Sequence, residues 1–142
     1  MNKFASMLLA LKMYIKQYHW LSKGYENHIL ADKLEESLDE YIDEAAELFV
    51  LRGKYLDDIS GLNILVDAKQ FIGGYYIGQD MNNMLRDIVS IIKEILILAQ
   101  SFGVEEEILK DGYGDYISRL SNLLLKKLYL LDVQLKKYED IQ

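Results

Sequence analysis

The sequence predicts an all-α protein, and three observations support that class. The 142 residues contain no proline, so no residue type that removes a helical hydrogen bond outright is present. Apolar residues recur at the three-and-four spacing that lays a stripe along one side of a helix. Apolar residues also make up 51% of the chain, enough for the core of one domain. We therefore expect a single domain over residues 1–142.

Four long helices follow from the apolar stripes. The first is expected over residues 2–22 and the second over 27–52, where Arg52-Gly53 closes it. The third begins near Met81 and ends at Gly103, and the Gly112-Tyr113-Gly114-Asp115 segment is expected to be a turn before the last helix. The residues expected to face inward include Phe4, Leu8, Leu11, Tyr14, Ile15 and Leu21, then Ala31, Leu34, Leu38, Tyr41, Ala45, Leu48 and Phe49, then Leu85, Ile88, Ile92 and Ile95, and finally Leu120, Leu124, Leu128 and Leu131.

The segment between the second and third helices is long and irregular. Glycines at 61, 73, 74 and 78 bracket Leu62 to Ile72, which could form a short helix lying across the bundle. Four helices with one long crossover between helices 2 and 3 fit the ferritin-like arrangement of a four-helix bundle. The same apolar stripes would specify any helical bundle, so fold alone does not give function.

Composition narrows the classes of function. The formal charge of -7 and the sequence pI near 4.8 argue against nucleic-acid binding, because such binding depends on Lys and Arg. The paired lysines at 126–127 and 136–137 are expected on the solvated face of the last helix. No apolar run reaches the roughly 20 residues of a membrane span, and no signal-peptide pattern is present. These features predict a soluble, cytoplasmic protein with no membrane association.

Both histidines of the chain lie close in sequence to a spaced set of carboxylates. His19 and His28 are followed by Asp32, Asp43 and Glu47. Imidazole with carboxylates, in a chain without cysteine, suits iron, manganese or zinc, whereas copper(I) and iron-sulfur clusters need sulfur ligands. We expect iron, bound by these five residues.

Helical geometry indicates that one chain cannot complete this site. On a continuous helix of about 100° per residue, His28, Asp32, Asp43 and Glu47 fall on one side. Asp32 and Asp43 are nevertheless roughly 16 Å apart along the axis, too far for one small metal centre. If a second copy packs antiparallel across a two-fold axis, His28 and Asp32 of one subunit face Asp43 and Glu47 of the other. The sequence thus predicts a two-fold dimer with two identical sites.

Ordinary ferritin-like di-iron proteins use Glu-x-x-His inside one bundle, and this chain has no such motif. The residues present resemble instead the mini-ferritins of the Dps family. The matching residues are His19-Trp20, Gly24, His28-x3-Asp32, Asp43-x3-Glu47 with Ala46 before the Glu, and Gly53. The likeness covers most of the chain and is sharpest over residues 19–53. The family usually separates its two histidines by about three more residues than this chain does, so the turn between them is shortened.

The resemblance implies a site shared between two subunits, a hollow dodecameric homo-oligomer, oxidation of Fe(II) preferably by hydrogen peroxide, and storage of the ferric product. Two alternatives stay open. The chain could be a helical bundle without ferroxidase activity that serves as an assembly or interaction protein, or a protein that protects DNA. For Trp20 we expect a packing role in preference to that of a redox relay. The acidic residues at positions 35–47 that are not ligands are expected to face solvent or a cavity.

Overall fold

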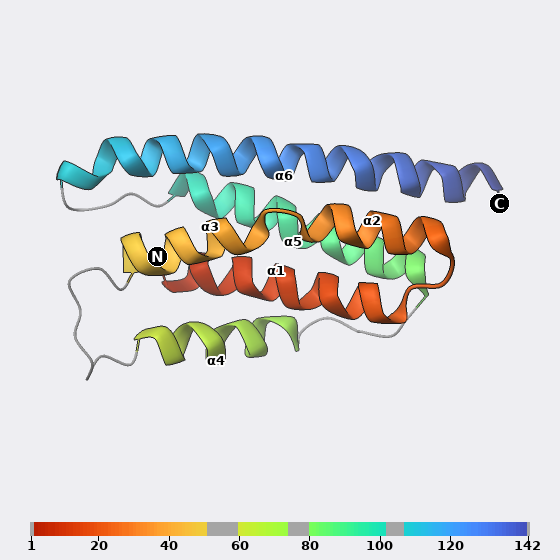
Figure 1. Ribbon diagram of the computed structural model, residues 1–142, viewed down its shortest axis with the longest axis horizontal. Coiled ribbons are helices and arrows are strands. Elements are labelled where there is room, and N and C mark those ends of the chain that lie inside the picture. The colour runs from red at the N-terminus through yellow and green to blue at the C-terminus, as the bar shows by residue number, and fades with distance from the viewer. Residues whose placement is uncertain (1, 51–59, 74–79, 102–106, 142) are drawn as a thin grey trace.

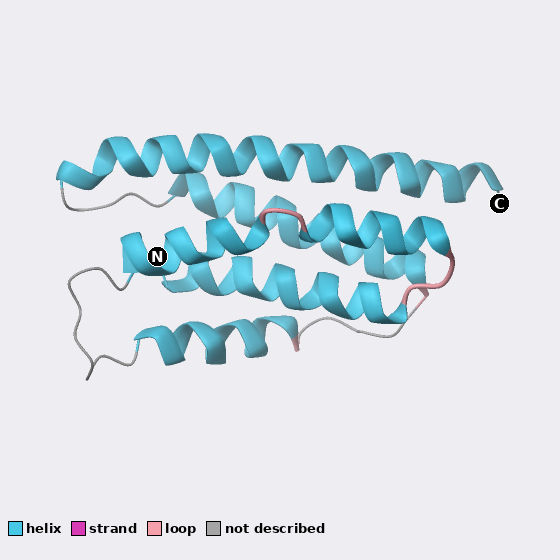
Figure 2. Cartoon of the chain, viewed as in Figure 1, coloured by secondary structure: helices cyan, strands magenta, loops and turns pink. Residues whose placement is uncertain are grey.

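The computed structural model of the chain describes residues 2–50, 60–73, 80–101 and 107–141. All regular secondary structure in these residues is helical (Figure 2). The elements are α1 (Asn2–Leu21), α2 (Tyr25–Glu35), α3 (Leu38–Glu44), the π-helix η1 (Ala45–Val50), α4 (Ser60–Ile72), α5 (Met81–Ser101) and α6 (Glu107–Ile141). The all-α class predicted from the sequence is confirmed.

The helices run along the long axis of the molecule (Figure 1). α2 and α3 together run antiparallel to α1, α5 runs in the same direction as α2 and α3, and α6 runs back antiparallel to α5. The connection between η1 and α5 therefore spans the length of the bundle. It contains the expected short helix, α4, which lies alongside α1 and does not cross the bundle.

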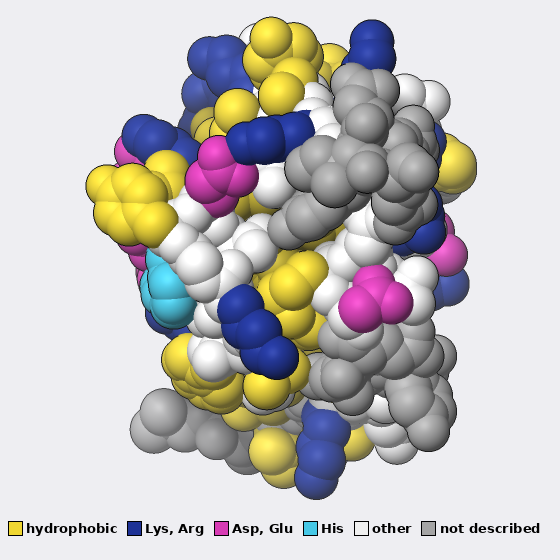
Figure 3. Space-filling view, turned by 90° about the vertical axis from the view of Figure 1, so that its right-hand side faces the viewer, with side chains coloured by type: hydrophobic (Ala, Val, Ile, Leu, Met, Phe, Trp, Pro, Cys, Tyr) yellow, Lys and Arg dark blue, Asp and Glu magenta, His cyan; other side chains and the backbone are white. Residues whose placement is uncertain are grey.

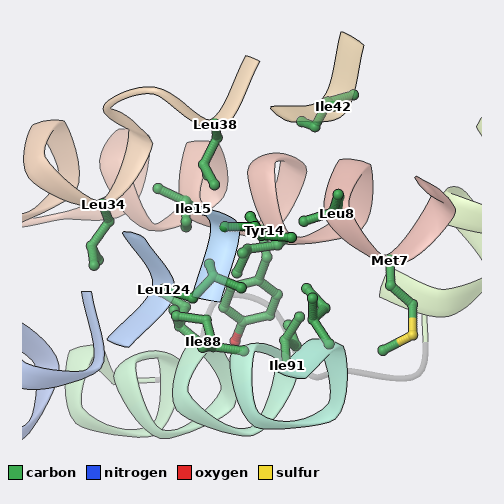
Figure 4. Close-up of a cluster of buried hydrophobic side chains, with 14 of the residues drawn as sticks. Met7, Leu8, Tyr14, Ile15, Leu34, Leu38, Ile42, Ile88, Ile91 and Leu124 are labelled. Carbon is green, nitrogen blue, oxygen red and sulfur yellow. The ribbon is translucent and has the colours of Figure 1, made fainter. Parts of the chain in front are cut away.

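The hydrophobic core surrounds α1, which packs against α2, α4 and α5. Tyr14 lies at the centre of the cluster in Figure 4 and is fully buried. Its hydroxyl donates a hydrogen bond to Asp87 Oδ2 at 2.6 Å. The apolar spacing predicted most of this core, since Phe4, Leu8, Leu11, Ile15, Leu34, Leu38, Leu85, Ile88, Ile92, Ile95, Leu120, Leu124 and Leu131 are all buried. Leu21 and Leu48, which we also expected inside, are exposed.

The predicted single helix over 27–52 is wrong, because the chain breaks after Glu35. Ser37 has φ 67° and ψ 0°, a left-handed conformation that ends one helix before α3 begins. Lys127 of α6 stabilises the break by donating hydrogen bonds to the carbonyl oxygens of Lys33 and Glu36, at 2.9 and 2.8 Å. These carbonyls lie at the end of α2, where intrahelical donors are missing.

The expectation that both paired lysines at 126–127 lie on a solvated face is therefore wrong for Lys127. Lys127 is only 2% exposed, whereas the neighbouring Lys126 is exposed. Burial lowers the pKa of the Lys127 ammonium to about 8 from its usual 10.5. Two backbone carbonyls and the nearby charge of Glu36 compensate the ammonium only in part.

The expected turn at Gly112 to Asp115 is also wrong, because these residues lie within α6. Tyr113 and Tyr116 are buried on the inner side of this first part of α6. The Tyr116 hydroxyl donates to the carbonyl oxygen of Tyr41 at 2.7 Å. Each glycine destabilises a helix by about 1 kcal/mol relative to alanine. The packing of the two tyrosine side chains outweighs this cost.

Replacing Gly112 or Gly114 by alanine is expected to stabilise the protein. Neither glycine has positive φ, and a Cβ added at either position meets nothing within 4 Å. Alanine should raise the free energy of unfolding by about 0.5–1 kcal/mol at each site. Urea denaturation followed by circular dichroism measures this, and a lower denaturation midpoint would show that these residues are not helical.

None of the helices in the part of the chain that the structure describes has the length and apolar character that a membrane span requires.

Candidate metal centre

A three-residue turn joins the two histidine-bearing helices. α1 ends at Leu21, and Ser22 donates to the carbonyl oxygen of His19 from its backbone N–H at 3.3 Å and from its hydroxyl at 2.7 Å. Gly24 follows with φ 85° and ψ 155°, a region of backbone space that is open essentially to glycine alone. α2 begins at the next residue, Tyr25, so the chain reverses direction within Ser22 to Gly24.

A buried asparagine fastens this turn to α1. Asn27 accepts a hydrogen bond from the Tyr18 hydroxyl at 2.6 Å and donates one to the carbonyl oxygen of Lys23 at 2.7 Å. Tyr18 is fully buried and Asn27 is 7% exposed. Buried polar groups joined in this way fix a single geometry. The register of the start of α2 against the end of α1 is therefore set on both sides of the turn.

The turn from Ser22 to Gly24 places the two histidines in contact. The ring centroids of His19 and His28 lie 5.5 Å apart, edge to face. Asp32 lies one helical turn beyond His28, with its Oδ1 3.7 Å from His19 Nδ1. Three of the five predicted ligand residues thus gather at one place, from the end of α1 and the outer side of α2. Imidazole nitrogen with carboxylate oxygen is a donor set suited to Fe(II), Mn(II) or Zn(II).

Glu35 is part of this cluster, although the sequence analysis did not single it out as a site residue. Its Oε1 lies 3.2 Å from His19 Nδ1, and its Oε2 accepts a hydrogen bond from Lys16 Nζ at 2.8 Å. That hydrogen bond and the charge of Glu35 raise the pKa of the Lys16 ammonium. Glu35 also lines, with Asp32, Lys33 and Glu36, a shallow pocket of about 290 Å³.

The other two predicted ligands lie further along the chain. Asp43 is on α3 and Glu47 is on η1, and both are exposed. The break at Glu36 and Ser37 lies between them and His28, so the calculation for one continuous helix does not apply across it. Among residues 2–50, 60–73, 80–101 and 107–141, no group of three or more His, Asp or Glu side chains is arranged to hold a metal ion. Asp43 and Glu47 therefore lie on other helices than His19, His28 and Asp32.

Three large apolar residues are exposed near the histidines. Trp20 is 68% exposed and Tyr25 is 80% exposed, on either side of the turn, and Ile29 follows His28 on α2 with 40% exposure. Figure 3 views the molecule from this end and shows a histidine side chain at the surface with apolar side chains above and below it. Exposed clusters of large apolar residues commonly mark interaction surfaces.

Comparison with known proteins gave no relative. No family model, no curated protein and no solved structure matches this chain.

Proposed function

We propose that the chain is a Dps-like mini-ferritin that oxidises Fe(II), with hydrogen peroxide as the preferred oxidant, at a site shared between two subunits. The ferric product would be stored inside a homo-oligomeric shell, for which the resemblance implies twelve subunits, in the cytoplasm. The convergence of His19, His28 and Asp32 at the turn after α1 carries the proposal, because it forms one half of the predicted ligand set from three separate positions of the sequence.

The helix directions support a ferritin-like bundle. Two antiparallel pairs, α1 with α2–α3 and α5 with α6, are joined by a connection that spans the bundle. Ferritin-like folds are four-helix bundles with one such crossover. The helix α4 within the connection packs on α1.

A two-fold dimer supplies the missing ligands. Pairing His28 with the partner's Glu47, and Asp32 with the partner's Asp43, places the two-fold axis midway, between positions 37 and 38. The break after α2 lies at this point. Each subunit then contributes imidazole at one end of the shared surface and carboxylate at the other, which generates two equal sites. The exposed apolar residues Tyr25 and Ile29 near His28, and Leu48 beside Glu47, would be covered by the partner.

Such a site suits two-electron chemistry with Fe(II) as the substrate. Two Fe(II) ions each give one electron to hydrogen peroxide, its O–O bond breaks, and two protons complete two molecules of water. Because both electrons go to one peroxide, no hydroxyl radical is released. Carboxylate oxygens favour the harder Fe(III) product, and the neutral imidazoles keep the ferrous ion exchangeable.

His28→Ala and Asp43→Ala are each expected to slow peroxide-dependent iron oxidation at least tenfold, since each removes a ligand from both sites of the dimer. Stopped-flow absorbance of the ferric product measures the rate, and circular dichroism should show unchanged helix content. Glu40→Ala is the matched control, because it removes an exposed carboxylate from the same helix as Asp43. Wild-type rates in both ligand variants would exclude the proposed site.

A second candidate is a bundle that keeps the oligomer but has no ferroxidase activity, and serves as an assembly or interaction protein. The observation in its favour is that the described part of one chain holds no group of three ligands arranged for a metal. Native mass spectrometry with metal analysis after anaerobic loading with Fe(II) separates the two. A retained oligomer without bound iron would favour the second candidate.

A further inference from the structure

The hydrogen bonds at the turn determine which nitrogen of each histidine carries a proton. The Ser22 hydroxyl has one proton, and its shortest contact is to the carbonyl oxygen of His19, at 2.7 Å. A carbonyl oxygen only accepts, so this proton is committed to it. The same hydroxyl oxygen lies 3.2 Å from His28 Nδ1. It can therefore act there only as an acceptor, and His28 Nδ1 must be the donor.

Two carboxylates fix the tautomer of His19 in the same way. Its Nδ1 lies 3.2 Å from Glu35 Oε1 and 3.7 Å from Asp32 Oδ1. Ionised carboxylates are acceptors only, so His19 Nδ1 is also the protonated nitrogen. Lys16 holds the second oxygen of Glu35 at 2.8 Å. Glu35 is thereby kept pointing towards His19 with its charge compensated.

We propose that Ser22 and Glu35 are positioning residues that hold His28 and His19 as Nδ1-protonated tautomers, so that both Nε2 lone pairs are available to divalent metal ions. Only the identity of the metal ion, iron, rests on the proposed function. The inference goes further by assigning the donor atoms and the residues that select them. Neutral imidazole binds a metal through whichever nitrogen lacks a proton, and the hydrogen bond made by the other nitrogen decides which one that is.

The burial of these partners makes the selection effective. Ser22 is 8% exposed, and the side chain of Glu35 is 19% exposed. Water competes poorly for such groups, and each already has a second partner that fixes its direction. His28 itself is exposed, so without Ser22 its Nδ1 would face solvent and both tautomers would be populated.

The tautomers can be read directly from two-bond ¹H–¹⁵N correlation spectra of the metal-free ¹⁵N-labelled protein, at a pH at which both imidazoles are neutral. We expect Nδ1–H for both rings in the wild type. Ser22→Ala should convert His28 to a mixture of tautomers while His19 is unchanged, and Ser22→Thr, which keeps the hydroxyl, should restore the wild-type pattern. Ser101→Ala is the matched control, because the Ser101 hydroxyl likewise donates to a carbonyl in the last turn of a helix, that of Ile97 in α5.

Metal affinity gives a second measurement, with Co(II) as the spectroscopic probe. Ser22→Ala and Glu35→Gln should each weaken Co(II) binding by about 10- to 100-fold, as loss of a residue that orients a ligand typically does. Two results would overturn the assignment of tautomers. One is an Nε2–H tautomer at His28 in the wild-type protein, and the other is a Ser22→Ala spectrum identical to the wild-type spectrum. If wild-type protein shows the expected tautomers but does not oxidise Fe(II), the proposed function fails and the assignment of tautomers stands. If Ser22→Ala does not fold, the wild-type spectrum alone decides.

Discussion

Replacing Lys127 by methionine is expected to abolish a rise in stability that the wild-type protein shows between about pH 8 and pH 10.5. The pKa of Lys127 is lowered to about 8 by burial, from 10.5 in the unfolded chain. Between these values the unfolded state binds more protons than the folded state, so the free energy of unfolding rises with pH. Below pH 8 both states are protonated and the full cost of burying the charge is present.

The size of this rise follows from the shift in the Lys127 pKa. Each pKa unit corresponds to about 1.4 kcal/mol, so the shift from 10.5 to about 8 gives an expected gain of roughly 3 kcal/mol across the window. Urea denaturation at successive pH values measures it. Burial also raises the pKa of Tyr113 and Tyr116, which lowers stability only above about pH 10. The difference between wild type and variant removes that contribution.

Lys126→Met is the control for Lys127→Met, because it removes the exposed neighbouring lysine and should leave the slope unchanged. The absolute stability of Lys127→Met at pH 7 is less informative. Methionine removes a buried charge, but it also leaves the carbonyl oxygens of Lys33 and Glu36 without their donor. A slope that persists in Lys127→Met would mean that this ammonium is not buried at the helix break.

Gly24→Ala is expected to destabilise the protein by about 1–3 kcal/mol, since alanine is strained at φ 85° and ψ 155°. Nothing lies within 4 Å of an added Cβ, so the loss would come from the backbone and not from a clash. The turn also places His28 beside His19, so the variant should show altered histidine ring resonances in NMR spectra.

Gly112→Ala is expected to change the free energy of unfolding in the opposite direction, because Gly112 lies within a helix. The pair therefore separates backbone conformation from the general effect of glycine on the unfolded chain. Equal stabilisation by Gly24→Ala and Gly112→Ala would contradict the conformation of the turn.

The sequence predicted the helices well because burial of apolar residues is periodic, as at Leu85, Ile88, Ile92 and Ile95 on α5. It could not predict the break at Ser37. Neither Glu36 nor Ser37 is a strong helix breaker, and the stabilising partner, Lys127, lies 91 residues from Glu36 in the sequence. Local glycine signals were misleading at Gly112 for the converse reason, because long-range packing outweighs them.

Part of the candidate site could also be predicted from the sequence. His28 and Asp32 share a helix face by spacing, whereas the contact of His19 with His28 depends on the conformation of the turn between their helices. Glu35 was missed although a signal existed, since seven residues after His28 it lies within about 20° of the same face. Ser22 carried no signal, because its role depends on the conformation of the turn.

Complementation between two ligand variants tests the shared site most directly. His28→Ala and Asp43→Ala chains, co-expressed with different tags, would form mixed dimers in which one site has lost both residues and the other has lost neither. We predict that each variant alone oxidises Fe(II) at least tenfold more slowly than the wild type, and that random mixing restores about a quarter of the wild-type sites. Purified mixed dimers should oxidise Fe(II) at about half the wild-type rate. No recovery in mixed dimers would contradict a site built from two subunits.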